Sequence, residues 1–125
     1  MAIKEIFDVI INRLPSTYPK VTLVIHSSVS ELVSEYESIR YRDKQGPPPF
    51  CFCDNKDNSI HVSLQLSRKS NEEVASYLLH ELGHLYAVSR YDYFDARCSD
   101  IKIAEQYADS FANRWVKKLK KEGLV

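Results

Sequence analysis

The chain has 125 residues, of which 44% are hydrophobic and 27% charged, and its formal net charge is zero. This size and composition predict one soluble globular domain, residues 1–125, with a modest core. The balanced charge gives no general attraction to nucleic acid or anionic membranes, and no apolar run is long enough to cross a bilayer. We therefore expect neither nucleic-acid nor membrane partners.

The segment 2–14 has the spacing of an amphipathic helix, with apolar residues at Ile3, Ile6, Phe7, Ile10, Ile11 and Leu14. Pro15 and Pro19 follow and end it. Acidic residues interrupt the apolar ones, which is not typical of a signal peptide, so the expected location is cytoplasmic.

Three shorter segments follow. Residues 21–26 are rich in β-branched side chains and predict a buried strand, with His26 at its end interpreted as structural rather than as a metal ligand. Ser28 and Glu31 resemble a capping box, so residues 28–37 predict a short helix or turn. Residues 38–42 are a candidate second strand.

The segment 50–66 predicts a β-hairpin. Residues 59–66 alternate between apolar and polar, and a turn-forming cluster at 54–58 separates them from residues 50–53. We interpret Cys51 and Cys53 as strand residues on opposite faces of the sheet and Cys98 as a loop residue. A bridge from Cys98 to one of the pair is the alternative, although cytosolic disulfides are rare.

The residues His80-Glu81-Leu82-Gly83-His84 form an H-E-x-x-H pattern on a helix that Ser70 or Asn71 would cap. Positions i and i+4 share one helix face, so both imidazoles can reach one metal ion. Zinc prefers such ligands, and a catalytic zinc keeps one position for water, beside Glu81 as general base. The pattern also arises by chance. Gly83 is unfavourable inside a helix unless another element must approach closely there.

The segment from residue 100 onward predicts a further amphipathic helix, with a stripe of small residues at Ala104, Ala108 and Ala112. Glu105 and Asp109 lie one turn apart at the edge of this stripe, where carboxylates are costly unless they are bound. We expect Glu105 to bind zinc and Asp109 to accept the free N–H of a ligand histidine. An exposed acidic pair is the alternative.

The order of His80, Glu81, His84, Glu105 and Asp109 resembles that of the gluzincin metallopeptidases, most of all the single-domain minigluzincins, and is similar to that of ImmA/IrrE-type peptidases. The predicted elements form an α+β fold, in which a small antiparallel or mixed sheet of three to four strands packs on an N-terminal helix and two C-terminal active-site helices. The resemblance implies a zincin-like upper subdomain. It also implies His80, His84 and Glu105 as zinc ligands, Glu81 as general base and acid, and Asp109 as the support of a ligand.

The oxyanion donor of larger gluzincins comes from a C-terminal subdomain that is not evident in this sequence. The candidates for that role, or for substrate contacts, are Tyr91 and Tyr93 in the segment 89–99, and His61. We expect the strand 59–66 to be an edge strand to which an extended peptide substrate adds.

The hypothesis is a zinc-dependent endopeptidase, in which Glu81 activates a zinc-bound water toward a peptide or protein substrate. The alternative is a latent or non-catalytic zinc-binding domain, regulated by its own terminus, by Cys51 or Cys53, or by a partner protein. A third class is a structural zinc site closed by four protein ligands, which would need His61, His26 or a cysteine.

Overall fold

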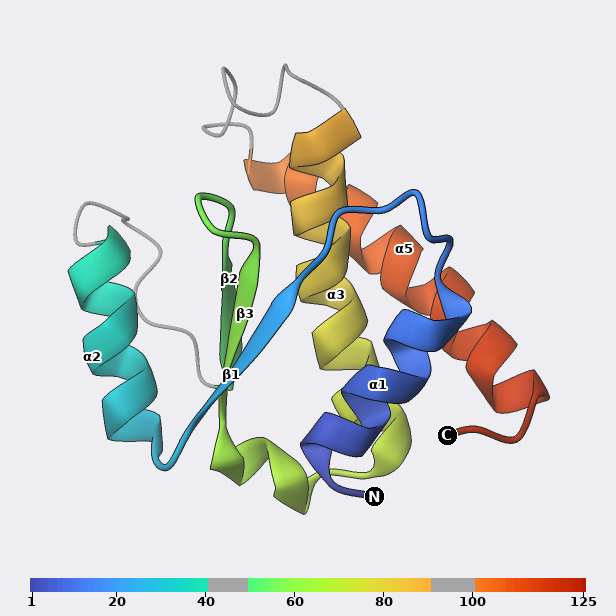
Figure 1. Ribbon diagram of the computed structural model, residues 1–125, viewed down its shortest axis with the longest axis horizontal. Coiled ribbons are helices and arrows are strands. Elements are labelled where there is room, and N and C mark those ends of the chain that lie inside the picture. The colour runs from blue at the N-terminus through green and yellow to red at the C-terminus, as the bar shows by residue number, and fades with distance from the viewer. Residues whose placement is uncertain (41–49, 91–100) are drawn as a thin grey trace.

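The computed structural model describes residues 1–40, 50–90 and 101–125. The fold is α+β, as predicted. In chain order the elements are α1 (Ile3–Arg13), β1 (Thr22–His26), α2 (Val29–Arg40), β2 (Cys51–Asp54), β3 (Ser59–Ser63), the 3-10 helix η1 (Leu64–Arg68), α3 (Asn71–Arg90) and α5 (Ile101–Lys121). Figure 1 shows the small sheet with α2 on one side and with α1, α3 and α5 on the other. Within the described ranges, no helix is long and apolar enough to span a membrane.

The sheet has the strand order β1-β3-β2, with β3 parallel to β1 and antiparallel to β2. The predicted hairpin is therefore confirmed, but its second strand ends at Ser63, whose hydroxyl accepts the Gln65 N–H at 3.1 Å and caps η1. The expectation that residues 59–66 form an edge strand is wrong. Because β1 pairs with β3 on the side opposite β2, the two edges of the described sheet are β1 and β2.

Two further strand predictions need correction. The strand at residues 22–26 is not buried, because it lies at an edge of the sheet, and Ile25 is 43% exposed. Residues 38–40 belong to α2 rather than to a strand, and residues 41–42 lie outside the described residues. The predicted cap of α2 is present, since the Glu31 N–H donates to the Ser28 hydroxyl at 3.2 Å.

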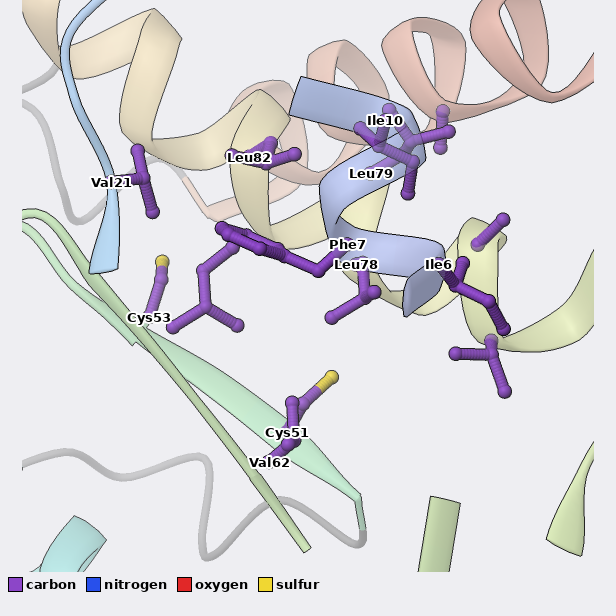
Figure 2. Close-up of a cluster of buried hydrophobic side chains, with 14 of the residues drawn as sticks. Ile6, Phe7, Ile10, Val21, Cys51, Cys53, Val62, Leu78, Leu79 and Leu82 are labelled. Carbon is purple, nitrogen blue, oxygen red and sulfur yellow. The ribbon is translucent and has the colours of Figure 1, made fainter. Parts of the chain in front are cut away.

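The main core lies between the sheet and helices α1 and α3, and Figure 2 shows Ile6, Phe7 and Ile10 of α1 reaching into it. Cys51 and Cys53 are both buried, and both side chains point into this core. The interpretation that they face opposite sides is wrong, because strand residues two apart point to the same face. They therefore act as small hydrophobic residues here.

Helices α3 and α5 approach closely where Gly83 faces Ala108. A Cβ atom added at Gly83 would lie 2.9 Å from the Ala108 Cα atom and 3.3 Å from the Phe111 Cβ atom. This confirms the close approach expected at Gly83. Because Gly83 stands next to His84, the same crossing brings side chains of the two helices together around one point.

Candidate metal centre

The N-terminus of α3 is capped, and the face of α3 opposite its two histidines is buried. The Ser70 hydroxyl accepts the Glu73 N–H at 3.2 Å and lies 3.1 Å from the Glu73 carboxylate, so Ser70 is the cap. The apolar residues Val74, Leu78, Leu82 and Leu85 are buried. His80 and His84 are half-buried on the side that faces α5.

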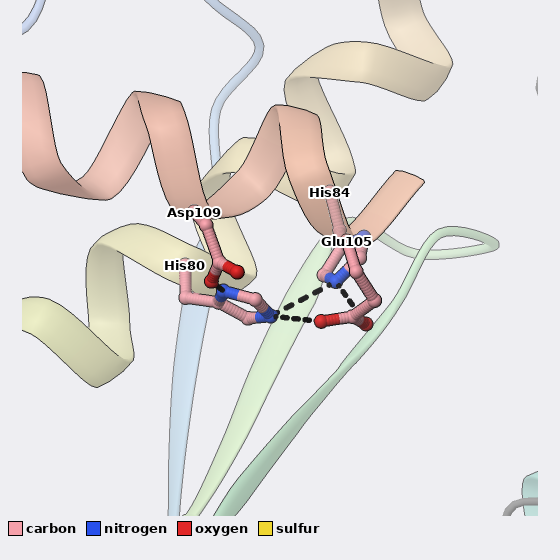
Figure 3. A network of polar contacts seen from close by, with 4 residues as sticks. All are labelled: His80, His84, Glu105 and Asp109. Carbon is pink, nitrogen blue, oxygen red and sulfur yellow. Dashed lines mark hydrogen bonds and ion pairs between the residues drawn. The ribbon is translucent and has the colours of Figure 1, made fainter. Parts of the chain in front are cut away.

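The side chains of His80, His84 and Glu105 converge, as Figure 3 shows. The two Glu105 carboxylate oxygens face one histidine each, with Oε2 3.0 Å from His80 Nε2 and Oε1 3.0 Å from His84 Nε2. The two Nε2 atoms are 3.1 Å apart. The ligand atoms of the three residues all lie within 4.8 Å of one another, which is close enough to bind one metal ion. Ligands at zinc distances around a tetrahedral ion would be about 3.3 Å apart.

Asp109 contacts the other ring nitrogen of His80, with Oδ1 2.9 Å from His80 Nδ1. The Nδ1–H of His80 donates to this carboxylate, so a neutral His80 carries a lone pair on Nε2. That lone pair faces the Glu105 carboxylate at 3.0 Å. Two acceptors at this distance repel each other unless a cation or an additional proton lies between them. The donor set of two imidazoles and one carboxylate therefore fits a divalent metal ion.

Glu81 lies on α3 between the two histidines and is only 9% exposed. The charge of Glu81 acts on the thiol of Cys51 in the edge strand β2. Burial first, and then this charge, raise the pKa of Cys51 well above its ordinary value. The thiol is therefore neutral at physiological pH. Within the described ranges, neither Cys51 nor Cys53 belongs to a group that could hold a metal ion. The sequence alone did not indicate that Glu81 acts on Cys51.

The structure does not bring His61 to this centre. Its strand neighbours Ile60 and Val62 face the main core, so His61 points to the opposite face of the sheet. There it contacts His26, with 2.9 Å between His61 Nδ1 and His26 Nε2. The prediction of His61 as a transition-state or substrate contact is therefore wrong, and neither histidine can close a four-ligand site. Tyr91, Tyr93 and Cys98 lie outside the described residues.

The C-terminal residues lie at the far end of α5 from Glu105, near the end of α1 (Figure 1). Arg13 of α1 and Glu122 form an ion pair at 3.3 Å. The turn is closed by the Leu124 N–H, which donates to the Leu119 carbonyl at 2.9 Å, with Gly123 at a φ of 74°. The C-terminal residues are thus held on the side of the molecule away from His80, His84 and Glu105.

No family model, curated protein or solved structure matches this chain.

Proposed function

We propose that this protein is a zinc-dependent endopeptidase of the gluzincin type. His80, His84 and Glu105 would bind the zinc ion and Glu81 would be the general base. The observation that supports this most is that two imidazoles of one helix and a carboxylate of another lie within bonding reach of a single ion. The buried Glu81 stands between the two histidines in the sequence.

Bound zinc would supply a Lewis acid that polarises a peptide carbonyl and makes a water molecule more acidic. Glu81 would take the proton from that water and pass it to the leaving amine. Asp109 would keep the Nε2 lone pair of His80 directed at the ion by accepting the Nδ1–H.

A peptide substrate would add to β2 rather than to β3. The strand β2 is an edge of the described sheet, packs against α3 and carries Cys51, on which the Glu81 charge acts. An extended peptide paired with such an edge runs past the catalytic side chains with its main chain fixed by hydrogen bonds. The strand expected for this role, β3, has neighbours on both sides.

The test combines metal analysis with a peptidase assay. Protein purified without chelator should contain about one equivalent of zinc, and it should hydrolyse an unfolded protein such as casein. Glu81→Gln should keep the zinc and lose activity by roughly 10²–10⁴-fold, because proton transfer is removed. The matched control is Glu72→Gln on the same helix, where Glu72 forms an exposed pair with Lys120, and it should stay active.

Three results would contradict the proposal. These are protein without zinc, Glu81→Gln protein as active as the wild type, and zinc-loaded wild-type protein that cleaves no peptide. The last result would favour the alternative of a non-catalytic zinc-binding domain.

A further inference from the structure

The face of the sheet opposite the metal centre carries a chain of polar contacts. The Ser59 hydroxyl donates to Asp57 Oδ1 at 2.6 Å and lies 3.0 Å from His61 Nε2. His61 Nδ1 in turn lies 2.9 Å from His26 Nε2. The two imidazole planes differ by 18° and their centroids are 5.2 Å apart, which suits a nearly coplanar hydrogen bond. We call these two residues the His26–His61 pair.

The positions of the protons follow from this chain. Because the Ser59 hydroxyl gives its proton to Asp57, it can only accept from His61, so His61 Nε2 carries a proton. In the neutral state His61 Nδ1 is then an acceptor, and His26 donates from Nε2. The pair can hold one extra proton on either ring and keep its bond. A second extra proton would place two N–H groups and two positive charges face to face across 2.9 Å.

The pair lies beside the contact that attaches α2 to the sheet. Leu32 and Tyr36 of α2 form a small cluster with Phe52 of β2, separate from the main core. The Phe52 ring stacks on His61, with centroids 4.7 Å apart and planes within 2°. Figure 1 shows α2 alone on this side of the sheet, away from α1, α3 and α5. A change at His61 therefore acts on the attachment of one helix.

The charged groups around the pair come from every element that packs on it. Burial and His26 lower the pKa of His61 below its ordinary 6.5, against the opposing effect of Glu35 on α2 and of Asp57 and Asp54 on the hairpin. Tyr36 belongs to the same cluster. The docked arrangement thus disfavours the proton on His61. The stabilisation that the docked arrangement gains from a neutral His61 is fully present above the ordinary pKa of histidine. It is lost as the pH falls below that value.

We propose that the His26–His61 pair is an acid-sensitive contact that releases α2 from the sheet while the core of α1, α3 and α5 stays folded. Hydrogen bonds from Ser27 lower the pKa of Glu31, so the carboxylate that caps α2 stays ionised through the pH range in which histidines titrate. Loss of that cap is therefore not the cause of the release. The proposal is independent of the metal centre and of any peptidase activity.

Hydrogen exchange and histidine NMR between about pH 7.5 and pH 5 test this proposal on the full chain. At the upper pH, the ¹⁵N shifts of His61 should report a protonated Nε2 and an unprotonated Nδ1. Below the ordinary pKa, protection factors of the α2 amides should fall by up to ~10-fold per pH unit for each proton taken up. Those of α3 and α5 should stay constant in the same samples.

His26→Gln is the decisive variant, because it can still hydrogen bond to His61 but cannot carry the second charge. It should keep α2 protected at acid pH. Glu72→Gln is the control on α3, where Glu72 forms an exposed pair with Lys120 away from the His26–His61 pair, and it should release α2 as the wild type does. Constant α2 protection in the wild type, equal loss in α2 and α3, or equal acid release in His26→Gln would overturn the proposal. If His26→Gln does not fold, an α2 transition in the wild type that does not coincide with the titration of the pair would overturn it as well.

Discussion

Asp109 contacts the candidate metal centre through one hydrogen bond, which His80 Nδ1 donates to Asp109 Oδ1 at 2.9 Å. Its side chain is 67% exposed, so it contributes little to the core. Its effect is on His80, since it selects the tautomer whose Nε2 is free to bind an ion. An exposed carboxylate in this structure thus has a specific role only because of the residue that it touches.

We predict that Asp109→Asn weakens zinc binding by roughly 10–100-fold, because a neutral amide orients and polarises the imidazole less than a carboxylate does. Competition with a chromophoric chelator measures the affinity. Asp8→Asn is the matched control, as Asp8 pairs only with Lys4 on the surface of α1. Equal zinc affinity of Asp109→Asn and wild type would show that the tautomer does not depend on Asp109.

At the scale of elements, the crossing of α3 and α5 decides whether the ligands meet. The lack of a side chain at Gly83 lets the Ala108 backbone lie next to α3. His84 follows directly after Gly83, and Glu105 lies almost one turn before Ala108. A larger distance between the helices would separate the carboxylate from both imidazoles.

We predict that Gly83→Ala destabilises the protein, although alanine is the better helix former by ~1 kcal/mol. The new Cβ atom would meet backbone at 2.9 Å, so the helices must move apart, and such overpacking costs roughly 1–3 kcal/mol. Urea denaturation of the metal-free protein measures the change, and zinc affinity should fall as well. Ser110→Ala, at an exposed position of α5, should change stability by less than ~0.5 kcal/mol. A Gly83→Ala protein more stable than the wild type would refute the packing argument.

At the scale of the whole molecule, the group formed by His80, His84 and Glu105 joins two successive helices, α3 and α5. A bound ion would stabilise the folded chain, because the unfolded chain does not hold the three ligand residues together. The sheet and α1 both pack against α3. A bound ion would therefore add a link between α5 and this part of the fold. Its loss should therefore loosen α5 first.

We predict that chelation lowers the thermal stability of the protein. At a free zinc concentration of 100 times Kd the ion would contribute ~2.7 kcal/mol, which corresponds to roughly 10 °C or more in Tm for a domain of this size. Scanning calorimetry with EDTA and with added zinc measures the shift. Glu105→Gln should respond much less to either reagent. An identical Tm with and without zinc in the wild type would argue against a bound ion.

Local patterns determined most of the elements. Helical spacing, caps and the turn cluster indicated α1, α2, α3, α5 and the hairpin, because these signals act between residues a few positions apart. The same spacing placed His80 and His84 on one helix face and Glu105 one turn before Asp109. The need for a close contact at Gly83 could also be inferred, since glycine is unfavourable there without one.

The tertiary structure alone decided the strand order, the face on which His61 lies and the effect of Glu81 on Cys51. An alternating strand has two faces, but its sequence does not say which element covers each, so it could not show that His61 faces away from the metal centre. The parallel pairing of β1 with β3 is a contact between distant segments, and it turned the expected edge strand into the central one. The pairing of His26 with His61 likewise depends on where two strands come to lie side by side. Such contacts arise from the packing of the whole chain, whereas spacing and capping are fixed by neighbours along it.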